Sequence, residues 1–127
     1  MSSVYEDLKE SCEYAAEFYE DMANGMLYCP NCCILVPEDH CGGCGETPQG
    51  LSEYLADNVY DARVTTDIHG TEMYSCRLMI AGGGPNIYID TGVGAICGYW
   101  GSDEVAVPLS SRCCDAINQA IDLWRDY

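Results

Sequence analysis

The chain has 127 residues, a length typical of one domain, and its 48% hydrophobic content excludes an intrinsically disordered protein. Its net charge of −16 makes nucleic acid and anionic membranes poor partners and basic protein surfaces good ones. No apolar run is long enough for a transmembrane helix, and the first residues do not resemble a signal peptide, so we expect a cytoplasmic protein. Its ten cysteines are then expected to be thiols rather than disulfides.

The first predicted element is an amphipathic helix over residues 3–24, in which Ser3 and Glu6 fit a capping box. Apolar residues at helical spacing form its expected buried face: Tyr5, Leu8, Cys12, Ala15, Tyr19 and Met22. Residues 26–46 show no helical period. Thr47 and Pro48 can then begin a short second helix that runs to about Asn58.

The next part of the chain alternates between apolar and polar residues, as half-buried strands do. These strands are expected near residues 60–68, 74–80, 87–89, 96–100 and 105–107. Glycine-rich turns separate them, which favours an antiparallel meander. A last helix begins at Ser110 or Ser111 and is expected to bury these residues: Cys113, Cys114, Ile117, Ile121 and Trp124.

This order of elements predicts an α+β fold over residues 1–127 as a single domain. The expected architecture is an antiparallel sheet of four to five strands covered by helices. Residues 26–46 are expected to form a zinc-binding hairpin inserted between the first two helices.

Two Cys-x-x-Cys pairs, separated by eight residues, carry the clearest chemical signal. They predict one structural zinc ion held by four thiolates, because each two-residue gap lets both sulfurs of a pair face one ion. The expected ligands are Cys29, Cys32, Cys41 and Cys44. Cys33 and His40 lie beside these pairs as alternative ligands, and iron is the main alternative metal.

Zinc ribbons often bind nucleic acid, but residues 26–46 contain three acids and no Lys or Arg. Four thiolates around Zn²⁺ add about two more negative charges. This hairpin therefore has no group that could neutralise phosphates, and we expect no direct contact with nucleic acid. A four-cysteine site also leaves no open position for catalysis.

Five carboxylates lie along one line of the first helix: Glu6, Glu10, Glu13, Glu17 and Glu20. Fourteen residues of helix span about 21 Å, so the carboxylates lie about 5 Å apart. Phosphates along a DNA strand lie ~3.4 Å apart, which is of the same order. These five residues, the acidic stripe, are either a solubilising face or a docking surface for a basic partner, and the second interpretation is preferred.

The remaining candidates for chemistry point away from an enzyme. His69 precedes a glycine in a turn and has no visible partner set for nucleophilic catalysis. Five cysteines fall on apolar faces and are expected to be small buried residues: Cys12, Cys76, Cys97, Cys113 and Cys114. The alternative for three of them is a second metal site made of Cys12, Cys113 and Cys114. Tyr99 and Trp100 suit either an interface or the core.

Two stretches of the C-terminal half are similar to a pattern found in small proteins of phages and mobile elements. They are Gly83-Gly84-Pro85-Asn86-Ile87-Tyr88-Ile89-Asp90-Thr91 and Gly98-Tyr99-Trp100-Gly101-x-Asp103. With the zinc hairpin and the acidity, the chain resembles zinc-containing anti-CRISPR proteins that inhibit Cas9-type effectors. The resemblance implies a stoichiometric inhibitor in the bacterial host cytosol, which binds the effector and blocks DNA loading or cleavage. The alternative is an anti-restriction or other DNA-mimic protein that occupies a basic surface of a different nuclease.

Overall fold

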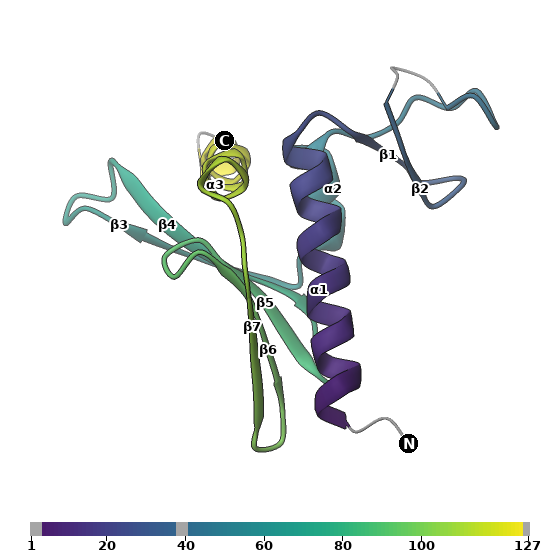
Figure 1. Ribbon diagram of the computed structural model, residues 1–127. Helices are drawn as coiled ribbons and strands as arrows, with labels where there is room; N and C mark the ends of the chain where they lie inside the picture. Colours follow the sequence, from purple (N-terminus) through teal and green to yellow (C-terminus); the bar gives the residue numbers. More distant parts are fainter. Residues whose placement is uncertain (1–3, 38–40, 126–127) are drawn as a thin grey trace.

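The structure is a computed structural model, and it describes residues 4–37 and 41–125. Helix α1 is followed by the short β1–β2 hairpin, helix α2, a five-stranded sheet and helix α3 (Figure 1). The bounds are α1 Val4–Ala23, β1 Leu27–Cys29, β2 Ile34–Val36, α2 Leu51–Asn58, β3 Asp61–Thr66, β4 Met73–Ala81, β5 Asn86–Asp90, β6 Ala95–Trp100, β7 Asp103–Pro108 and α3 Ser111–Arg125. The predicted α+β class and antiparallel sheet are confirmed.

The five strands pair in chain order, β3-β4-β5-β6-β7, and every pair is antiparallel. One row of the ladder crosses four strands through Leu78, Ile89, Ile96 and Val107. Leu78, Ile89 and Ile96 are completely buried, because helices cover this face of the sheet. The alternation of apolar residues in the sequence therefore identified the covered face correctly.

Helix α1 lies directly against β6 and β7. Its buried line consists of Leu8, Cys12, Ala16, Tyr19 and Met22. Gly98 of β6 allows the close approach, since a Cβ there would lie 2.5 Å from Cys12 Sγ and 2.9 Å from a Leu8 methyl. The absence of a side chain at Gly98 thus sets the distance between helix and sheet.

Helix α3 packs on β4 over the same face. The side chain of Asn118 accepts a hydrogen bond from Thr91 Oγ1 at 2.7 Å, and Thr91 Oγ1 accepts from the backbone N–H of Cys76 at 2.8 Å. Helix α2 packs mainly against α3 and β1, and Trp124 Nε1 donates to Ser52 Oγ at 3.3 Å. The two longer helices therefore cover the sheet, and α2 fills the space beside them.

Two helix details differ from the sequence-based expectation. The second helix begins at Leu51 rather than at Thr47, because Gln49 pairs with Tyr28 in an isolated β-bridge that keeps the backbone extended. In α1, Ala16 is buried while Ala15 is half-buried and Tyr5 is 45% exposed. The buried line advances by four residues from Leu8 to Cys12 and again to Ala16, and by three residues after that, so it includes Ala16 rather than Ala15.

The expected strand over residues 60–68 is shorter than predicted, and its covered-side residues remain in solvent. Tyr60 and Ile68 lie outside β3, and their exposed fractions are 75% and 94%. Val64 pairs with Cys76 on the helix-covered side, yet it is 40% exposed. The reason is that β3 is an edge strand, whereas the helices pack mainly on β4, β6 and β7.

The other face of the sheet carries an arginine stacked on tyrosines. The Arg77 guanidinium lies 4.0 Å from the centre of the Tyr88 ring and 6.0 Å from that of Tyr99. The two rings meet edge to face at 5.9 Å, and Arg77 Nε lies 3.9 Å from an Asp90 carboxylate oxygen. Tyr99 is therefore part of this surface cluster rather than of the core, while Trp100 beside it is 40% exposed.

Among the described helices, none combines the length and the apolar character that crossing a membrane requires.

Candidate functional site

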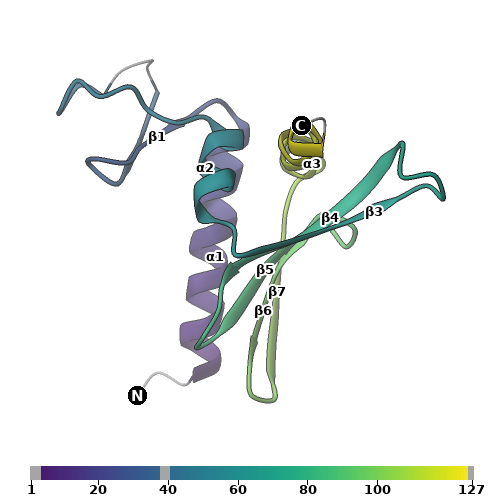
Figure 2. The ribbon, with the colours of Figure 1, turned by 180° about the vertical axis from the view of Figure 1, so that it is seen from behind.

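The β1–β2 hairpin projects beyond the ends of α1 and α2, far from the tip of the β3–β4 hairpin (Figure 1). Figure 2 shows the same separation from behind. The hairpin has its own small core of Cys29, Val36 and Cys41, separate from the main core. Tyr28 and Gln49 exchange two backbone hydrogen bonds, at 2.8 and 2.6 Å, which fasten the hairpin to the segment before α2.

The turn after β1 brings the first pair of sulfurs together. The backbone N–H of Cys32 points at Cys29 Sγ, with the nitrogen 3.4 Å from the sulfur, and Cys33 N–H donates to Cys29 O at 2.8 Å. Cys33 adopts a left-handed backbone with φ of 59° to close this turn. In the second pair, Gly45 N–H donates to Cys41 O at 2.7 Å and closes an equivalent turn.

The four predicted ligands converge on one point. Their sulfur atoms all lie within 4.8 Å of one another. Cys29 Sγ is 3.6 Å from Cys44 Sγ, and Cys41 Sγ is 3.7 Å from Cys32 Sγ. A zinc tetrathiolate with Zn–S bonds of about 2.3 Å has sulfur–sulfur edges of about 3.8 Å, so these residues fit the ion. The thiols can hold one metal ion; a tetrahedral four-sulfur set also suits iron.

Hydrogen bonds make the four sulfurs unequal. Donation from the Asn31 side chain, with the Glu46 backbone N–H, lowers the pKa of the Cys44 thiol to about 6. The neighbouring Cys44 sulfur raises the pKa of Cys32 to about 12. A site with one readily ionised thiol and a neighbour that retains its proton must release protons when it binds a metal.

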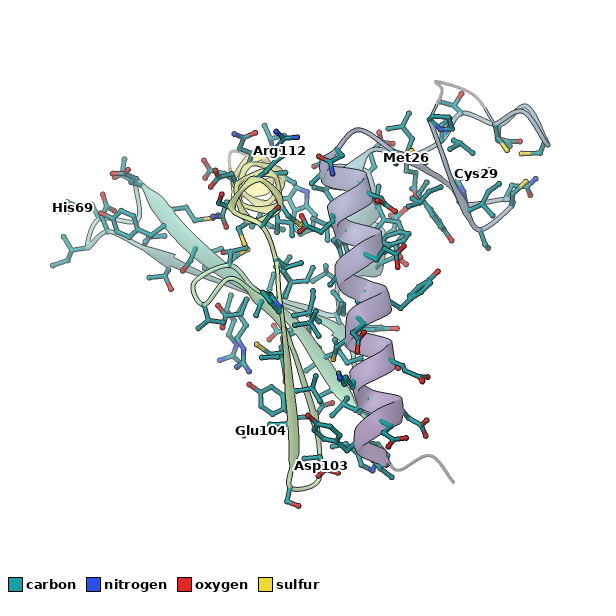
Figure 3. All side chains as sticks on the ribbon, in the orientation of Figure 1. Met26, Cys29, His69, Asp103, Glu104 and Arg112 are labelled. Carbon is teal, nitrogen blue, oxygen red and sulfur yellow. The ribbon has the colours of Figure 1, made fainter. Side chains whose placement is uncertain are left out.

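The structure also places the alternative ligands. Cys33 is exposed, and its thiol points to the carbonyl of Pro30 at 3.7 Å rather than to the sulfur cluster. His40 lies outside the described residues. His69 is at the tip of the β3–β4 hairpin, on the opposite side of the molecule from Cys29 (Figure 3). Cys33 is therefore not a ligand in this arrangement, and His69 lies far from the sulfur cluster.

The five other cysteines are buried, as expected: Cys12, Cys76, Cys97, Cys113 and Cys114. Burial raises the pKa of the Cys12 and Cys76 thiols to about 11 and that of Cys113 to about 12. Such thiols stay protonated and unreactive at neutral pH. Within the described ranges, only the four hairpin cysteines form a metal-ligating group, so a second site with Cys12 is not found.

Oxygen-tipped side chains project into solvent from the side of α1 that faces away from the sheet (Figure 3). Glu6, Glu10, Glu13 and Glu17 are exposed, and Glu20 is half-buried. Lys9 lies beside the stripe, with Nζ 3.9 Å from a Glu13 carboxylate oxygen. This exposed pair is a weak interaction, so the line remains strongly negative.

Comparisons with family models, curated proteins and solved structures find no match to this chain.

Sequence reasoning missed a groove that only the tertiary structure assembles. It has a volume of about 660 Å³ and lies between α1, the β1–β2 hairpin, α2 and the sheet. Six aromatic residues from these segments line it: Tyr14, Phe18, Tyr19, Tyr28, Tyr54 and Tyr60. We call it the tyrosine groove. The high tyrosine content was visible in the sequence, but the residues are too scattered along the chain to indicate a common site.

Proposed function

We propose that this chain is a zinc-stabilised acidic protein that docks on the basic nucleic-acid-binding surface of a protein partner and inhibits it. The preferred partner is a CRISPR effector of the Cas9 type, in which docking blocks DNA loading or cleavage. The observation that carries the proposal is the exposed acidic line along α1, in a chain of net charge −16. The choice of effector is supported by the sequence resemblance.

In this proposal the metal is zinc and its role is structural. The hairpin core has three buried residues, of which two are themselves ligands, so apolar burial alone is too small to hold it. A closed set of four thiolates supplies that stability and leaves no coordination position for a substrate. The ion thus shapes the surface around it, and the protein acts by occupancy rather than by turnover.

The charge distribution supports protein docking rather than direct nucleic-acid binding. Four stripe carboxylates are solvent-exposed, and Lys9 is the only base within α1. Channels that hold nucleic acid in Cas9-type effectors are lined by positive charge. The acidic stripe can therefore compete with nucleic acid for binding to such a channel.

The proposal is tested by reversing charge on the stripe. The double variant Glu10→Lys and Glu13→Lys is compared with a second double variant, Glu72→Lys and Glu104→Lys, which changes the net charge equally at exposed positions outside α1. Binding to a panel of Cas9–guide complexes is measured at low and high salt. We expect the stripe variant to lose at least about tenfold in affinity, because like charges across an interface repel.

Equal losses of affinity in both variants would show that only the net charge matters, and would overturn the docking role of the stripe. A salt-independent affinity would contradict electrostatic docking, because exposed charges are screened by salt. Capture of a restriction nuclease, with no binding to any Cas9–guide complex, would replace the preferred partner by the anti-restriction alternative.

A further inference from the structure

The tyrosine groove is lined by a cluster of aromatic rings that reaches the solvent at its rim. Its rings pack closely, with centres 4.8 Å apart for Tyr28 and Tyr54 and 5.0 Å apart for Phe18 and Tyr54. At its rim, Tyr14 is 73% exposed and Tyr60 is 75% exposed. Aromatic residues, tyrosine among them, are enriched at protein interfaces relative to the rest of the surface.

The groove is also negatively charged. Glu17 and Asp21 of α1 line it, and the described lining residues include no Lys or Arg. Glu17 belongs to the acidic stripe, so the groove continues that surface toward the hairpin. A second copy of this chain, itself at −16, would be repelled. The fitting occupant is a cation with a flat, weakly hydrated face, which describes a guanidinium group.

The protein already contains an example of this chemistry on its sheet. There, the Arg77 guanidinium lies 4.0 Å from the Tyr88 ring centre and 3.9 Å from an Asp90 carboxylate oxygen. The groove offers the same combination of tyrosine rings and carboxylates, with Tyr14 and Glu17 only three positions apart on α1.

The chain's own described cations are engaged elsewhere. Their contacts are Lys9 with Glu13, Arg63 with Asp61, Arg77 with Tyr88 and Arg112 with Asn24. None of these four described cations lines the groove, which leaves its aromatic and acidic groups open to a cation from another molecule.

We infer that the tyrosine groove binds an arginine-bearing segment of the protein partner, with guanidinium groups stacked on tyrosine rings and paired with Glu17 and Asp21. This inference rests on the proposed function in one respect, the basic character of the partner. It adds a second recognition surface beside the acidic stripe. One wall of the groove is the metal-binding hairpin, through Tyr28 and Ile34, so the metal also shapes this surface.

The test uses the metal-loaded full chain and a short amidated peptide with two arginines. The same peptide with citrulline at both positions is the neutral control of equal shape. Titration is followed by amide chemical shifts in NMR. We expect the arginine peptide to shift resonances around Tyr14, Ile34 and Tyr54, and to bind at least about fivefold more tightly than the citrulline peptide.

A matched pair of variants locates the site. Tyr14→Leu with Glu17→Gln removes one ring and one charge from the groove, whereas Tyr74→Leu with Glu72→Gln removes the same groups from an exposed region near the β3–β4 hairpin. Only the first variant is expected to weaken arginine-peptide binding, by at least about fivefold. Equal affinity for the citrulline peptide, equal weakening in both variants, or no shifts at the groove would overturn the inference.

The outcome is separable from that of the proposed function. Docking of the Cas9–guide complex through the stripe, with no peptide in the groove, would overturn the groove inference alone. Peptide binding at the groove, with no effector or nuclease captured, would overturn the proposed function and leave the groove in place.

Discussion

The Glu20 carboxylate of α1 accepts two hydrogen bonds from Ser110, one from the backbone N–H at 3.0 Å and one from the hydroxyl at 2.5 Å. Ser110 Oγ in turn accepts from the backbone N–H of Cys113 at 3.1 Å, so Ser110 caps α3. In a capping box the acid comes from the same helix, but here it comes from ninety residues earlier in the chain. One member of the predicted docking stripe therefore joins two helices.

This contact predicts a stability effect for Glu20→Gln that an exposed stripe residue does not share. At pH 7 we expect a loss of about 1 kcal/mol in the free energy of unfolding, as for a lost cap or charged hydrogen bond. Glu17→Gln is the control, because it removes the same charge without a cap. Urea unfolding of both variants measures the difference, and equal stabilities would contradict the capping role.

The same contact predicts a pH dependence. The Ser110 hydroxyl lowers the pKa of Glu20 below its ordinary value of 4.5. The ionised carboxylate therefore stabilises the fold above pH 4.5, and this contribution is lost as the pH falls through the lower folded-state pKa. The gap between the Glu20→Gln and wild-type chains should close in that range. Comparison with Glu17→Gln at each pH removes effects of metal loss that all chains share.

Metal binding should depend on Cys29 and not on Cys33. Elemental analysis is expected to find one zinc per chain in the wild type and in Cys33→Ser, and none in Cys29→Ser. The reason is that Cys29 belongs to the cluster of four sulfurs, whereas Cys33 does not. An iron content with visible thiolate absorption would contradict zinc. Loss of metal in Cys33→Ser would contradict the ligand set.

Removal of the metal should unfold the hairpin and spare the sheet, because their buried clusters are separate. After chelation, amides of residues 27–36 are expected to lose protection from hydrogen exchange, while amides of β4, β5 and β6 keep theirs. Global unfolding in the same experiment would show that the hairpin is required by the whole domain.

Gly98→Ala should destabilise the domain by about 1–3 kcal/mol, as other overpacked cores are. The added methyl would meet Cys12 Sγ and a Leu8 methyl, which α1 holds in place. Gly84→Ala is the control, since its Cβ would lie 3.4 Å from the Trp100 ring in ordinary contact. Thermal unfolding measures the stability of both variants. Equal destabilisation by the two substitutions would contradict the close approach of α1 to β6.

The hydroxyl of Thr91 should contribute more to the stability of the fold than the hydroxyl of Thr65, an exposed threonine in β3. Thr91→Val leaves the Cys76 N–H without its side-chain acceptor and removes the shorter of the two hydrogen bonds to Asn118 Oδ1, at a cost of about 1–3 kcal/mol. Thr65→Val, at an exposed position, should change stability by less than about 0.5 kcal/mol. Chemical denaturation distinguishes the two, and similar values would contradict the role of this network.

The sequence by itself determined most of the element order, the sheet and the four cysteines that cluster at one point. These features depend on local spacing: the apolar period marks helices and strands, and each Cys-x-x-Cys pair folds into one turn that brings its two sulfurs together. Where a distant partner competes, local reasoning misjudged the chain. Gln49 pairs with Tyr28 and delays α2, and β3 at the sheet edge leaves Val64 exposed.

Only the tertiary structure decided how the acidic stripe is divided and what lies beside it. Glu20 and Glu17 are equivalent in sequence pattern, yet Glu20 caps α3 while Glu17 lines the tyrosine groove. The physical reason is that a helix pattern specifies which side a residue faces, whereas its partners come from other elements. Tyr14, Tyr28, Tyr54 and Tyr60 meet at one groove because α1, the hairpin, α2 and the sheet pack around it.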